Sequence, residues 1–300
     1  MAEPLLQAQP LLPEQKGLSV LQRVRRADVV TDPFPFVVVR DAIPDALCRA
    51  LIEQYPAPAA VAADEGSNSR WSLPASEVAT SADIASIWKA FIEYHASPAF
   101  FSEVVDVFGG EIVRLYPHAY PDESRLRAVA LGVRNRDDFD RCELLMDAQI
   151  AGNTPVTEAS SVKTIHIDSN NKLYTALLYL RAPEDDSTGG DLDIVRFRND
   201  LTRAERRRRY DGMFVDEKLT EPVLRINYAS NVLLMFVNCV NALHGVTVRS
   251  PTPHRRLFLN LVGEVDFPLF EVPKYWPNRL RKLPRIVRKR LRRAVGLAEK

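Results

Sequence analysis

Cysteine is scarce in this sequence, and its distribution is informative. The chain has three cysteines in 300 residues, Cys48, Cys142 and Cys239, with long gaps between them and no CxxC motif. A sparse, odd set argues against a disulfide framework and favours a reducing compartment, so we expect a cytoplasmic protein. The N-terminal residues lack the basic segment and apolar core of a secretory signal. The longest apolar run, Val232 to Val240, is interrupted by Asn238 and is too short to span a bilayer.

The charged residues balance almost completely, but they are unevenly distributed. The formal net charge is +1, with 26% charged and 46% hydrophobic residues, which is typical of a soluble globular protein. The last segment, 274–300, nevertheless contains eleven Lys or Arg and a single acidic residue. The remaining residues are therefore slightly acidic, and the sequence predicts a near-neutral body with a basic tail.

The basic tail has the pattern of an amphipathic helix. Nine of the fifteen residues in 279–293 are Lys or Arg, and the apolar residues fall on one helical stripe. This pattern, with Tyr275 and Trp276 before it, favours contact with an anionic membrane surface. Packing against the body or an acidic partner is the alternative. Nucleic acid is the least favoured partner, because no nucleic-acid-binding motif accompanies the charge.

The chain length fits one large domain or two small ones. We expect a lead-in over 1–33, one domain over 34–270 and the tail over 274–300. Within the domain, helical periodicity over 34–110 predicts a supporting layer of one strand and three helices. From residue 143 to 265 the pattern changes to a β-core.

The supporting layer and the segment after it contain few candidates for chemistry. The strand is expected over 36–39, and Gly109-Gly110 is expected to end the third helix. Residues 125–141 are charged and irregular, which indicates a loop. His95 and His118 are read as ordinary core or surface histidines.

The β-core consists of short β-branched and aromatic runs separated by turn residues. Seven or eight short strands in this length indicate a β-sandwich or barrel. The runs cover 144–150, 162–167, 173–180, 192–197, 223–226, 231–237 and 257–262. One insertion, Leu201 to Arg209, predicts a short exposed helix; its four consecutive arginines form either a solvated face or a patch for an anionic substrate.

Three residues in the β-core have the chemistry of an iron site. His166 and Asp168 are separated by one residue, so on a strand both point to the same side, about 7 Å apart along it. His244 follows after several intervening strands. Two imidazoles and one carboxylate leave coordination positions open, which suits Fe(II) in an oxygenase. A structural zinc site would instead favour cysteine and a closed fourth position.

A lone His-x-Asp arises often by chance, but here it lies within a longer ordered pattern. After it come Thr175-A-L-L-Tyr179-Leu180, a Gly189-Gly190 turn, an apolar strand ending at Phe236, His244 and finally Arg255-Arg256. In this order and spacing, the chain resembles the 2-oxoglutarate/Fe(II)-dependent dioxygenases, in particular the prolyl-4-hydroxylase-like branch. The resemblance covers 143–265 and is weaker over the F-P-F-V-V-V-R-D segment.

The resemblance implies a mainly β fold with flanking helices (α+β), a double-stranded β-helix of the jelly-roll or cupin-like type. It implies that His166, Asp168 and His244 are the metal ligands and the catalytic centre. It also implies an arginine that binds the distal carboxylate of 2-oxoglutarate. On a strand, Arg255 and Arg256 point to opposite faces; Arg256 is favoured because polar Asn260 shares its face.

Other cosubstrate contacts follow from the resemblance. Tyr179 matches a position whose hydroxyl reaches the same carboxylate, although a tyrosine on a central strand also fits an ordinary core role. Gln149 and Asn153 fall where cosubstrate or substrate contacts occur in the family, with plain strand and turn roles as the alternative. Asn238, polar within an apolar strand, fits a hydrogen bond in the site or a bulge.

The implied activity is hydroxylation of a C–H bond with release of succinate and CO2. Fe(II) and the cosubstrate 2-oxoglutarate are implied, with ascorbate as a candidate addition. The tail favours a biosynthetic small molecule or a glycoconjugate as substrate. The alternatives are a prolyl-type hydroxylase of protein residues, a non-catalytic jelly-roll module that binds a metal or ligand, and a nucleic-acid demethylase.

Overall fold

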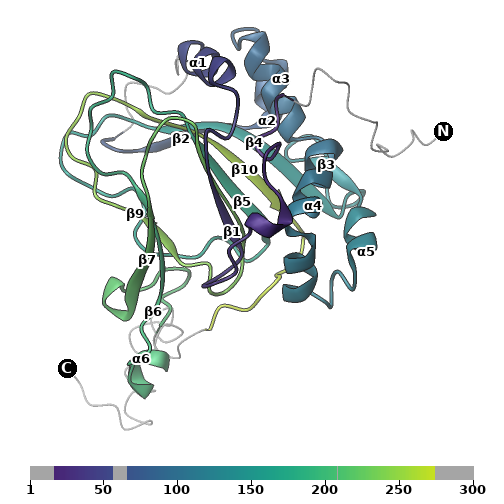
Figure 1. The fold of residues 1–300 in the computed structure, drawn as a ribbon, viewed down its shortest axis with the longest axis vertical. Coiled ribbons are helices and arrows are strands. Elements are labelled where there is room, and N and C mark those ends of the chain that lie inside the picture. Colours follow the sequence, from purple (N-terminus) through teal and green to yellow (C-terminus); the bar gives the residue numbers. More distant parts are fainter. Residues whose placement is uncertain (1–16, 57–65, 208, 274–300) are drawn as a thin grey trace, which may run out of the picture.

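The computed structural model describes residues 17–56, 66–207 and 209–273, which form a layer of helices on a β-sandwich (Figure 1). The strands are β1 Phe36–Arg40, β2 Arg70–Leu73, β3 Leu131–Val133, β4 Leu144–Asn153, β5 Lys172–Tyr179, β6 Leu192–Phe197, β7 Thr220–Ile226, β8 Val232–Val237, β9 His244–Val246 and β10 Arg256–Glu264. The helices are α1 Asp45–Glu53, α2 Ala75–Thr80, α3 Ser86–His95, α4 Pro98–Leu115, α5 Glu123–Arg127 and α6 Arg203–Arg207, with 3-10 turns η2 Arg26–Asp28 and η3 Glu217–Leu219.

The larger of the two sheets has seven strands in the order β1-β8-β5-β10-β4-β2, with β3 beside β4. All of these pairs are antiparallel except β3 with β4. Its central strands are buried on both faces; β8, for example, has no exposed residue. A strand covered on both faces is apolar throughout, which explains the continuous hydrophobic run that the sequence shows there.

The smaller sheet has the order β7-β6-β9 and is extended by a segment around His166. His166 forms antiparallel bridges with His244 of β9 on one side and with Phe214 on the other. The chain alternates between the sheets: β4 is in the larger one, the His166 segment in the smaller, and β5 in the larger again. Strands β6 and β7 follow in the smaller sheet, then β8, β9 and β10 alternate. This is the topology of a jelly roll, which confirms the predicted fold.

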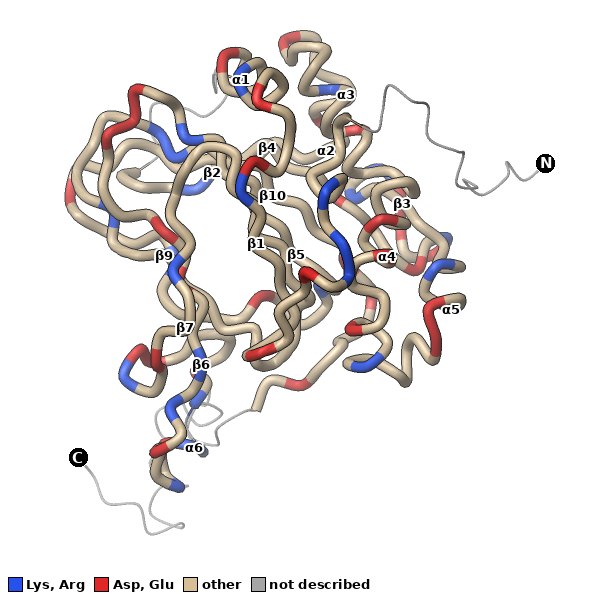
Figure 2. Tube along the Cα trace, viewed as in Figure 1, with Lys and Arg blue, Asp and Glu red and all other residues tan. Residues whose placement is uncertain are grey.

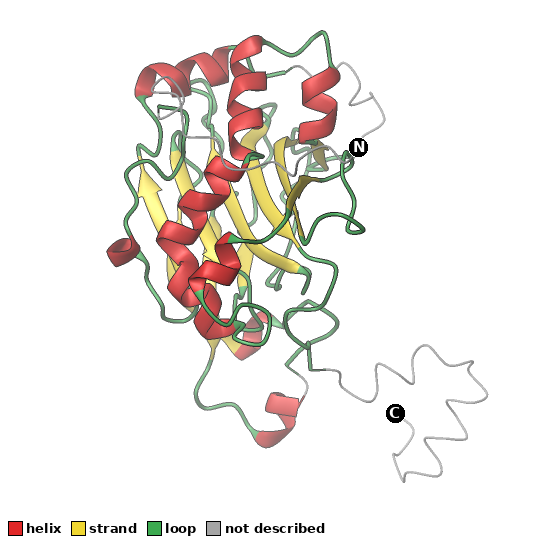
Figure 3. Cartoon of the chain, turned by 90° about the vertical axis from the view of Figure 1, so that its right-hand side faces the viewer, coloured by secondary structure: helices red, strands yellow, loops and turns green. Residues whose placement is uncertain are grey.

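Among the described residues, helices cover the outer face of the larger sheet (Figure 3). Large side chains of α3 and α4 pack there against alternate residues of β4, β5 and β10 in one core cluster. Trp88, Phe91, Phe101 and Phe108 are all nearly or completely buried. A second cluster lies between the two sheets and a third lies around the β6–β7 connection. The helical layer therefore fixes the larger sheet from behind and leaves its inner face to the space between the sheets.

The packed core begins before residue 33, where the lead-in was expected to end. Val20 and Leu21 are buried in the core cluster with α3 and α4. Farther on, Arg26 forms a double hydrogen bond with Glu123 of α5 (2.6 and 2.8 Å). Residues 17–33 are therefore part of the domain body. Charges of both signs mix over this helical side of the molecule (Figure 2).

The prediction that Gly109-Gly110 ends a helix was wrong, because α4 continues to Leu115. Two glycines inside a helix cost about 1 kcal/mol each relative to alanine. Burial of Phe108 and Ile112 on either side of them offsets this cost, at about 1.5–3 kcal/mol per side chain. At Gly109 a side chain would also approach the carboxyl group of Glu123 to 3.0 Å, so the glycine lets α5 pack closely.

Other local predictions also needed correction. Residues 125–141, expected as a loop, contain most of α5 and the strand β3, while β2, α2 and β9 lie outside the predicted ranges. The strand predicted over 162–167 is reduced to the bridges of His166. The exposed helix predicted from Leu201 to Arg209 is present as α6.

Cys48, Cys142 and Cys239 carry free thiols. Within the described residues, no helix has the length and apolar character needed to cross a membrane. The predicted amphipathic helix over 279–293 lies outside the described residues.

Candidate metal centre

The structure brings together the three residues that the sequence singled out as metal ligands. His166 and His244 face each other across their antiparallel bridge, with ring centroids 4.3 Å apart. Asp168 follows two residues after His166. One potential ligand atom from each residue lies within 4.8 Å of the others, and all three residues are buried. The geometry thus brings two imidazoles and one carboxylate close enough together to bind one metal ion.

Backbone carbonyls fix the tautomers of both histidines. The Nδ1 of His166 lies 2.8 Å from the carbonyl of Thr164, and the Nδ1 of His244 lies 2.9 Å from that of Ala242. A carbonyl oxygen only accepts hydrogen bonds, so Nδ1 carries the proton and the Nε2 lone pair is free. Burial lowers the pKa of His166 to about 2 and also lowers that of His244. Both rings are therefore neutral at physiological pH, as metal binding requires.

Asp168 is held as a carboxylate. Burial alone would raise its pKa, but the charges of Lys172 and Lys163 hold the pKa well below its usual range. Each lysine Nζ lies 3.6 Å from a carboxylate oxygen of Asp168. The hydroxyl of Thr175 donates a hydrogen bond of 2.7 Å to Oδ2. Thr175 therefore orients one oxygen, while the other points toward the imidazole of His166 at 3.8 Å.

Asn238 has a positioning role near these ligands. Its side-chain amide is fully buried and donates to the carbonyls of Ser169 (2.7 Å) and Lys172 (3.2 Å). Ser169 lies in the turn that joins Asp168 to β5, and Lys172 is the first residue of β5. Of the two roles considered for Asn238, the structure shows a hydrogen-bonding one: its amide connects this turn to the residue after β8.

A second polar group lies farther along the inner face of the larger sheet, around Arg256. Its guanidinium is 3% exposed and lies 4.8 Å from the ring centroid of Tyr179 and 5.2 Å from that of Tyr228. Its Nε donates to the carbonyl of Gly190 at 2.9 Å. From Thr175 to Tyr179 is four residues along β5, about 13 Å at the usual rise per residue. The two polar groups therefore lie toward opposite ends of one face.

Several donors of this second group lack partners among the described residues. These are Nη2 of Arg256, the hydroxyl of Tyr179 and the side-chain nitrogen of Asn153. Buried polar groups are nearly always hydrogen-bonded, so three such donors close together indicate a binding site for an anion. The neighbouring arginine, Arg255, is exposed and points to the other face. The structure therefore places Arg256, as the preferred assignment expected, on the inner face.

The Gly189-Gly190 turn makes room for Arg256. Both glycines have φ of +75°, a conformation that side chains disfavour. A Cβ on Gly189 would lie 1.9 Å from the carbonyl oxygen of Val248, and one on Gly190 would crowd the Arg256 side chain at 3.4 Å. Glycine is therefore required for the carbonyl of Gly190 to reach the guanidinium.

Gln149 lies on the same face, opposite Asn260 of β10. Its amide nitrogen donates to Asp147 at 2.7 Å, and its oxygen accepts from Asn260 at 2.9 Å. These three polar residues line the face beside the metal ligands. Contact between Gln149 and a cosubstrate stays a prediction, because both ends of its amide already have protein partners.

Sequence reasoning missed three residues near the site. Arg70 of β2 and Phe214 lie close to the predicted ligands and are considered below. Arg249 is 1% exposed, lies 3.6 Å from Asp185 and donates to the carbonyl of His254 at 3.0 Å, so it anchors the loop before β10. Alternation of polar and apolar residues in R-W-S-L was the available signal for β2. Nothing in the local sequence marks Phe214 or Arg249.

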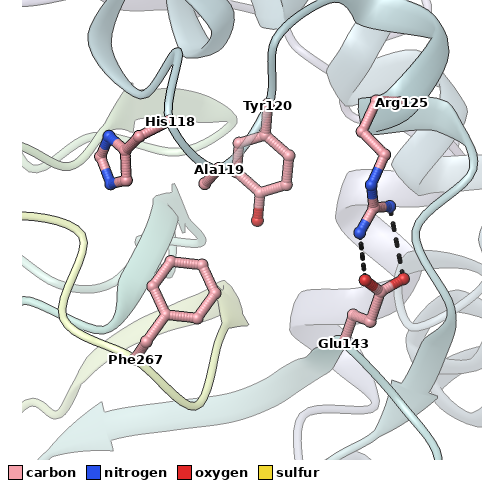
Figure 4. A pocket seen from close by; sticks show the side chains of 6 residues that line it. All are labelled: His118, Ala119, Tyr120, Arg125, Glu143 and Phe267. Atoms are coloured by element: carbon pink, nitrogen blue, oxygen red, sulfur yellow. Dashed lines mark hydrogen bonds and ion pairs between the residues drawn. The ribbon is translucent and has the colours of Figure 1, made fainter.

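Two surface cavities lie away from this centre. One of about 260 Å³ is lined by His118, Tyr120 and Phe267 beside the Arg125–Glu143 ion pair (Figure 4). A second of about 670 Å³ lies on the smaller sheet and includes residues of β6, β7 and β9. Neither includes His166, Asp168 or His244. His118 is exposed and His95 is buried in the core, so both are ordinary histidines, as expected.

Comparison with known proteins gives weak likenesses only. No family model and no curated protein matches the chain. A putative oxygenase from Shewanella oneidensis is 13% identical, with a TM-score of 0.44, covering 88% of this chain and 91% of the other. HygX from Streptomyces hygroscopicus, solved with nickel and 2-oxoglutarate, is 14% identical, with a TM-score of 0.40 and coverages of 86% and 88%. A Pseudomonas putida prolyl-4-hydroxylase is 13% identical, with a TM-score of 0.38 and coverages of 77% and 93%.

Proposed function

We propose that this protein is an Fe(II)- and 2-oxoglutarate-dependent dioxygenase. One observation carries the proposal: a two-histidine, one-carboxylate centre and a buried arginine with a free donor lie between the two sheets, toward opposite ends of β5. His166 and His244 offer neutral Nε2 atoms, and Asp168 offers an oxygen that Thr175 orients. This donor set matches the facial triad of non-haem iron oxygenases. When bound, Fe(II) would activate O2 while 2-oxoglutarate is oxidised to succinate and CO2, so that one oxygen atom of O2 enters succinate and the other enters the substrate C–H bond.

The residues of the chain bind and orient the reactants. Arg256 pairs with the distal carboxylate of 2-oxoglutarate through its free Nη2, and the hydroxyl of Tyr179 donates to the same group. Tyr228 and Phe258 enclose the guanidinium and exclude water from this pair. Gly190 holds the guanidinium in place through its carbonyl. His166, Asp168 and His244 would hold the metal toward the other end of the same face.

A biosynthetic small molecule or a glycoconjugate is the proposed substrate, and ascorbate and a cytoplasmic location stay predictions. A prolyl-type hydroxylase of protein residues is the alternative within the same chemistry. A non-catalytic jelly-roll module would retain metal binding without turnover. Release of succinate from 2-oxoglutarate under air separates this module from the two enzymes.

The test is anaerobic titration of the protein with Fe(II) and 2-oxoglutarate. The bidentate chelate of the two is expected to give a weak visible charge-transfer band. The His166→Ala variant should lose this band, because one of three protein ligands is gone. His118→Gln, an exposed histidine away from the centre, is the matched control and should keep it. A missing band in the wild type, or an unchanged band in His166→Ala, contradicts the proposal.

A further inference from the structure

Arg70 is an arginine on the inner face of the sandwich to which the proposed function gives no role. It is the first residue of β2 and pairs with Asn153 of β4, which pairs in turn with Arg256 of β10. Residues directly opposite each other in antiparallel strands project to the same face. Arg70 therefore projects to the face that carries Asn153 and Arg256. Its guanidinium lies 5.4 Å from the ring centroid of Phe258, and that of Arg256 lies 5.3 Å from the same ring.

The charge of Arg70 is not compensated by a partner within residues 17–56, 66–207 and 209–273. Loss of hydration lowers its pKa, the carboxylate of Asp168 raises the pKa, and the charge of Arg256 lowers it. Arg70 thus interacts with both polar groups, and the residue itself is exposed to solvent at the edge of the sheet. A guanidinium keeps its charge at neutral pH. Arg70 therefore presents a permanent positive charge to the space beside the metal centre.

Positive charge also exceeds negative charge around Asp168. Lys163 and Lys172 both lie 3.6 Å from its carboxylate. Lys163 and Lys172 thus share this one carboxylate, and the charge of Arg70 also acts on Lys163. Together these side chains comprise three cations and one carboxylate. Figure 2 shows that the strands of the larger sheet are otherwise mostly uncharged.

The proposed cosubstrate does not remove this excess. In the metal-loaded protein, the Asp168 carboxylate that faces the lysines would hold the divalent metal. The two carboxylates of 2-oxoglutarate have their own counter-charges, which are the metal and Arg256. Arg70 and Lys163, which both reach solvent, are then left without an anion. Uncompensated charges in a partly desolvated site favour a ligand of opposite charge.

An apolar side chain lies on another side of the metal ligands. Phe214 is bridged to His166, so its side chain projects to the same face as both histidines. Its ring centroid lies 6.1 Å from that of His166, yet the residue is 46% exposed. An exposed phenylalanine beside a metal ligand provides a contact surface for the apolar part of a substrate.

We propose that the substrate carries a carboxylate or phosphate group that Arg70 binds, next to an apolar portion that contacts Phe214. This inference rests on the proposed function, because it takes the metal centre as the place of reaction. The planar guanidinium suits either oxyanion through paired hydrogen bonds. Lys163, beside Asp168, adds a second positive charge near the metal centre. Arg70 is thus a specificity-determining residue and distinct from the arginine that binds 2-oxoglutarate.

The test uses protein loaded with Ni(II) and 2-oxoglutarate and measures binding by calorimetry. The probes are phenyl phosphate, benzoate and, as the neutral control, benzamide. At least one anion should bind ten times more tightly than benzamide, and the better anion identifies the oxyanion. Arg70→Gln should weaken that binding at least tenfold and leave the affinity for 2-oxoglutarate within twofold. Arg49→Gln, an exposed arginine on α1, should match the wild type.

Two further variants keep the outcome decisive. Arg70→Lys retains charge without the guanidinium fork and replaces the Gln variant if that one fails to fold. Phe214→Ala should weaken phenyl phosphate binding several-fold and leave inorganic phosphate binding unchanged. Anion binding no tighter than that of benzamide, or equal binding by wild type and Arg70→Gln, overturns the inference.

Failure of the proposed function would look different. If the metal centre is not one, the protein takes up neither Ni(II) nor 2-oxoglutarate; if the protein is a non-catalytic module, it takes up Ni(II) but releases no succinate under air. The same anion titrations on unloaded protein then still decide whether Arg70 binds an oxyanion.

Discussion

The two faces of the larger sheet differ sharply, although the same strands form both. On the outer face, Leu259 and Leu261 of β10 pack with Ala176 and Leu178 of β5 beneath the helices. On the inner face, the intervening residues of these strands are largely polar or aromatic, and several bear on the candidate site. They are Arg256, Phe258 and Asn260 of β10 and Thr175 and Tyr179 of β5.

The difference shows that the inner face stabilises the fold less than the outer face, because it carries the polar residues of the candidate site. Each outer side chain contributes about 1.5–3 kcal/mol by burial. Each inner polar donor without a partner costs about 1–3 kcal/mol. One outer residue, Tyr174, also has a buried hydroxyl without a partner among the described residues. The inner face differs because an arginine, a tyrosine and an asparagine gather at one place, which a bound anion would satisfy together.

Substitution on the outer face should have the largest effect on stability. Leu261 is fully buried in the helix-covered cluster, so Leu261→Ala should cost about 4 kcal/mol by lost transfer energy and the remaining cavity. Denaturant unfolding measures this. The matched change on the inner face is Asn260→Ala, whose partner Gln149 is partly exposed to water. It should cost below about 2 kcal/mol. Equal losses of unfolding free energy in the two variants would show that the outer face does not contribute more to stability than the inner face.

Substitution on the inner face should have the largest effect on binding. Arg256→Gln removes the charge that we propose binds the 2-oxoglutarate carboxylate and should weaken cosubstrate binding about 100-fold, or about 3 kcal/mol. Calorimetry of 2-oxoglutarate with Ni(II)-loaded protein measures this. Arg255→Gln is the control, because Arg255 is exposed on the other face. A stronger effect of Arg255→Gln would place the cosubstrate elsewhere.

The sequence predicted much of this arrangement because its main signals are local. The strands with continuous apolar runs were found, and alternation along β10 separated Arg256 from Arg255. The order of His166, Asp168 and His244 relative to the strands was also sufficient to predict that they lie close together in the fold. Contacts between distant segments could not be predicted this way.

The missed features depend on tertiary packing. Strand β2 has four residues, and its pairing with β4 places Arg70 beside the candidate site. Phe214 reaches the site through a bridge with His166 across a long connection. Gly109 and Gly110 continue a helix because the residues around them are buried. In each case a contact far away in sequence outweighs the local preference.

A buried histidine also lies on the outer side of the larger sheet: His95 is in the helical core, whereas His166 and His244 face the inner side. The Nδ1 of His95 lies 2.7 Å from the carbonyl of Phe91, and its Nε2 accepts a hydrogen bond from the backbone N–H of Val20 at 3.2 Å. A proton on Nε2 would face that N–H donor, and burial lowers the pKa of His95 to about 4. The unfolded chain, with an ordinary pKa near 6.5, binds the proton more readily.

Stability contributed by neutral His95 is therefore present above about pH 6.5 and is lost as the pH falls toward 4. Between pH 7 and pH 5 the loss amounts to about 2 kcal/mol. Denaturant unfolding of the wild type and of His95→Gln at both pH values measures it, with His118→Gln as the exposed control. The His95→Gln variant should show a smaller pH dependence than both. An unchanged pH dependence would mean that the acid sensitivity of the fold arises outside the helical core, for example at the inner-face histidines.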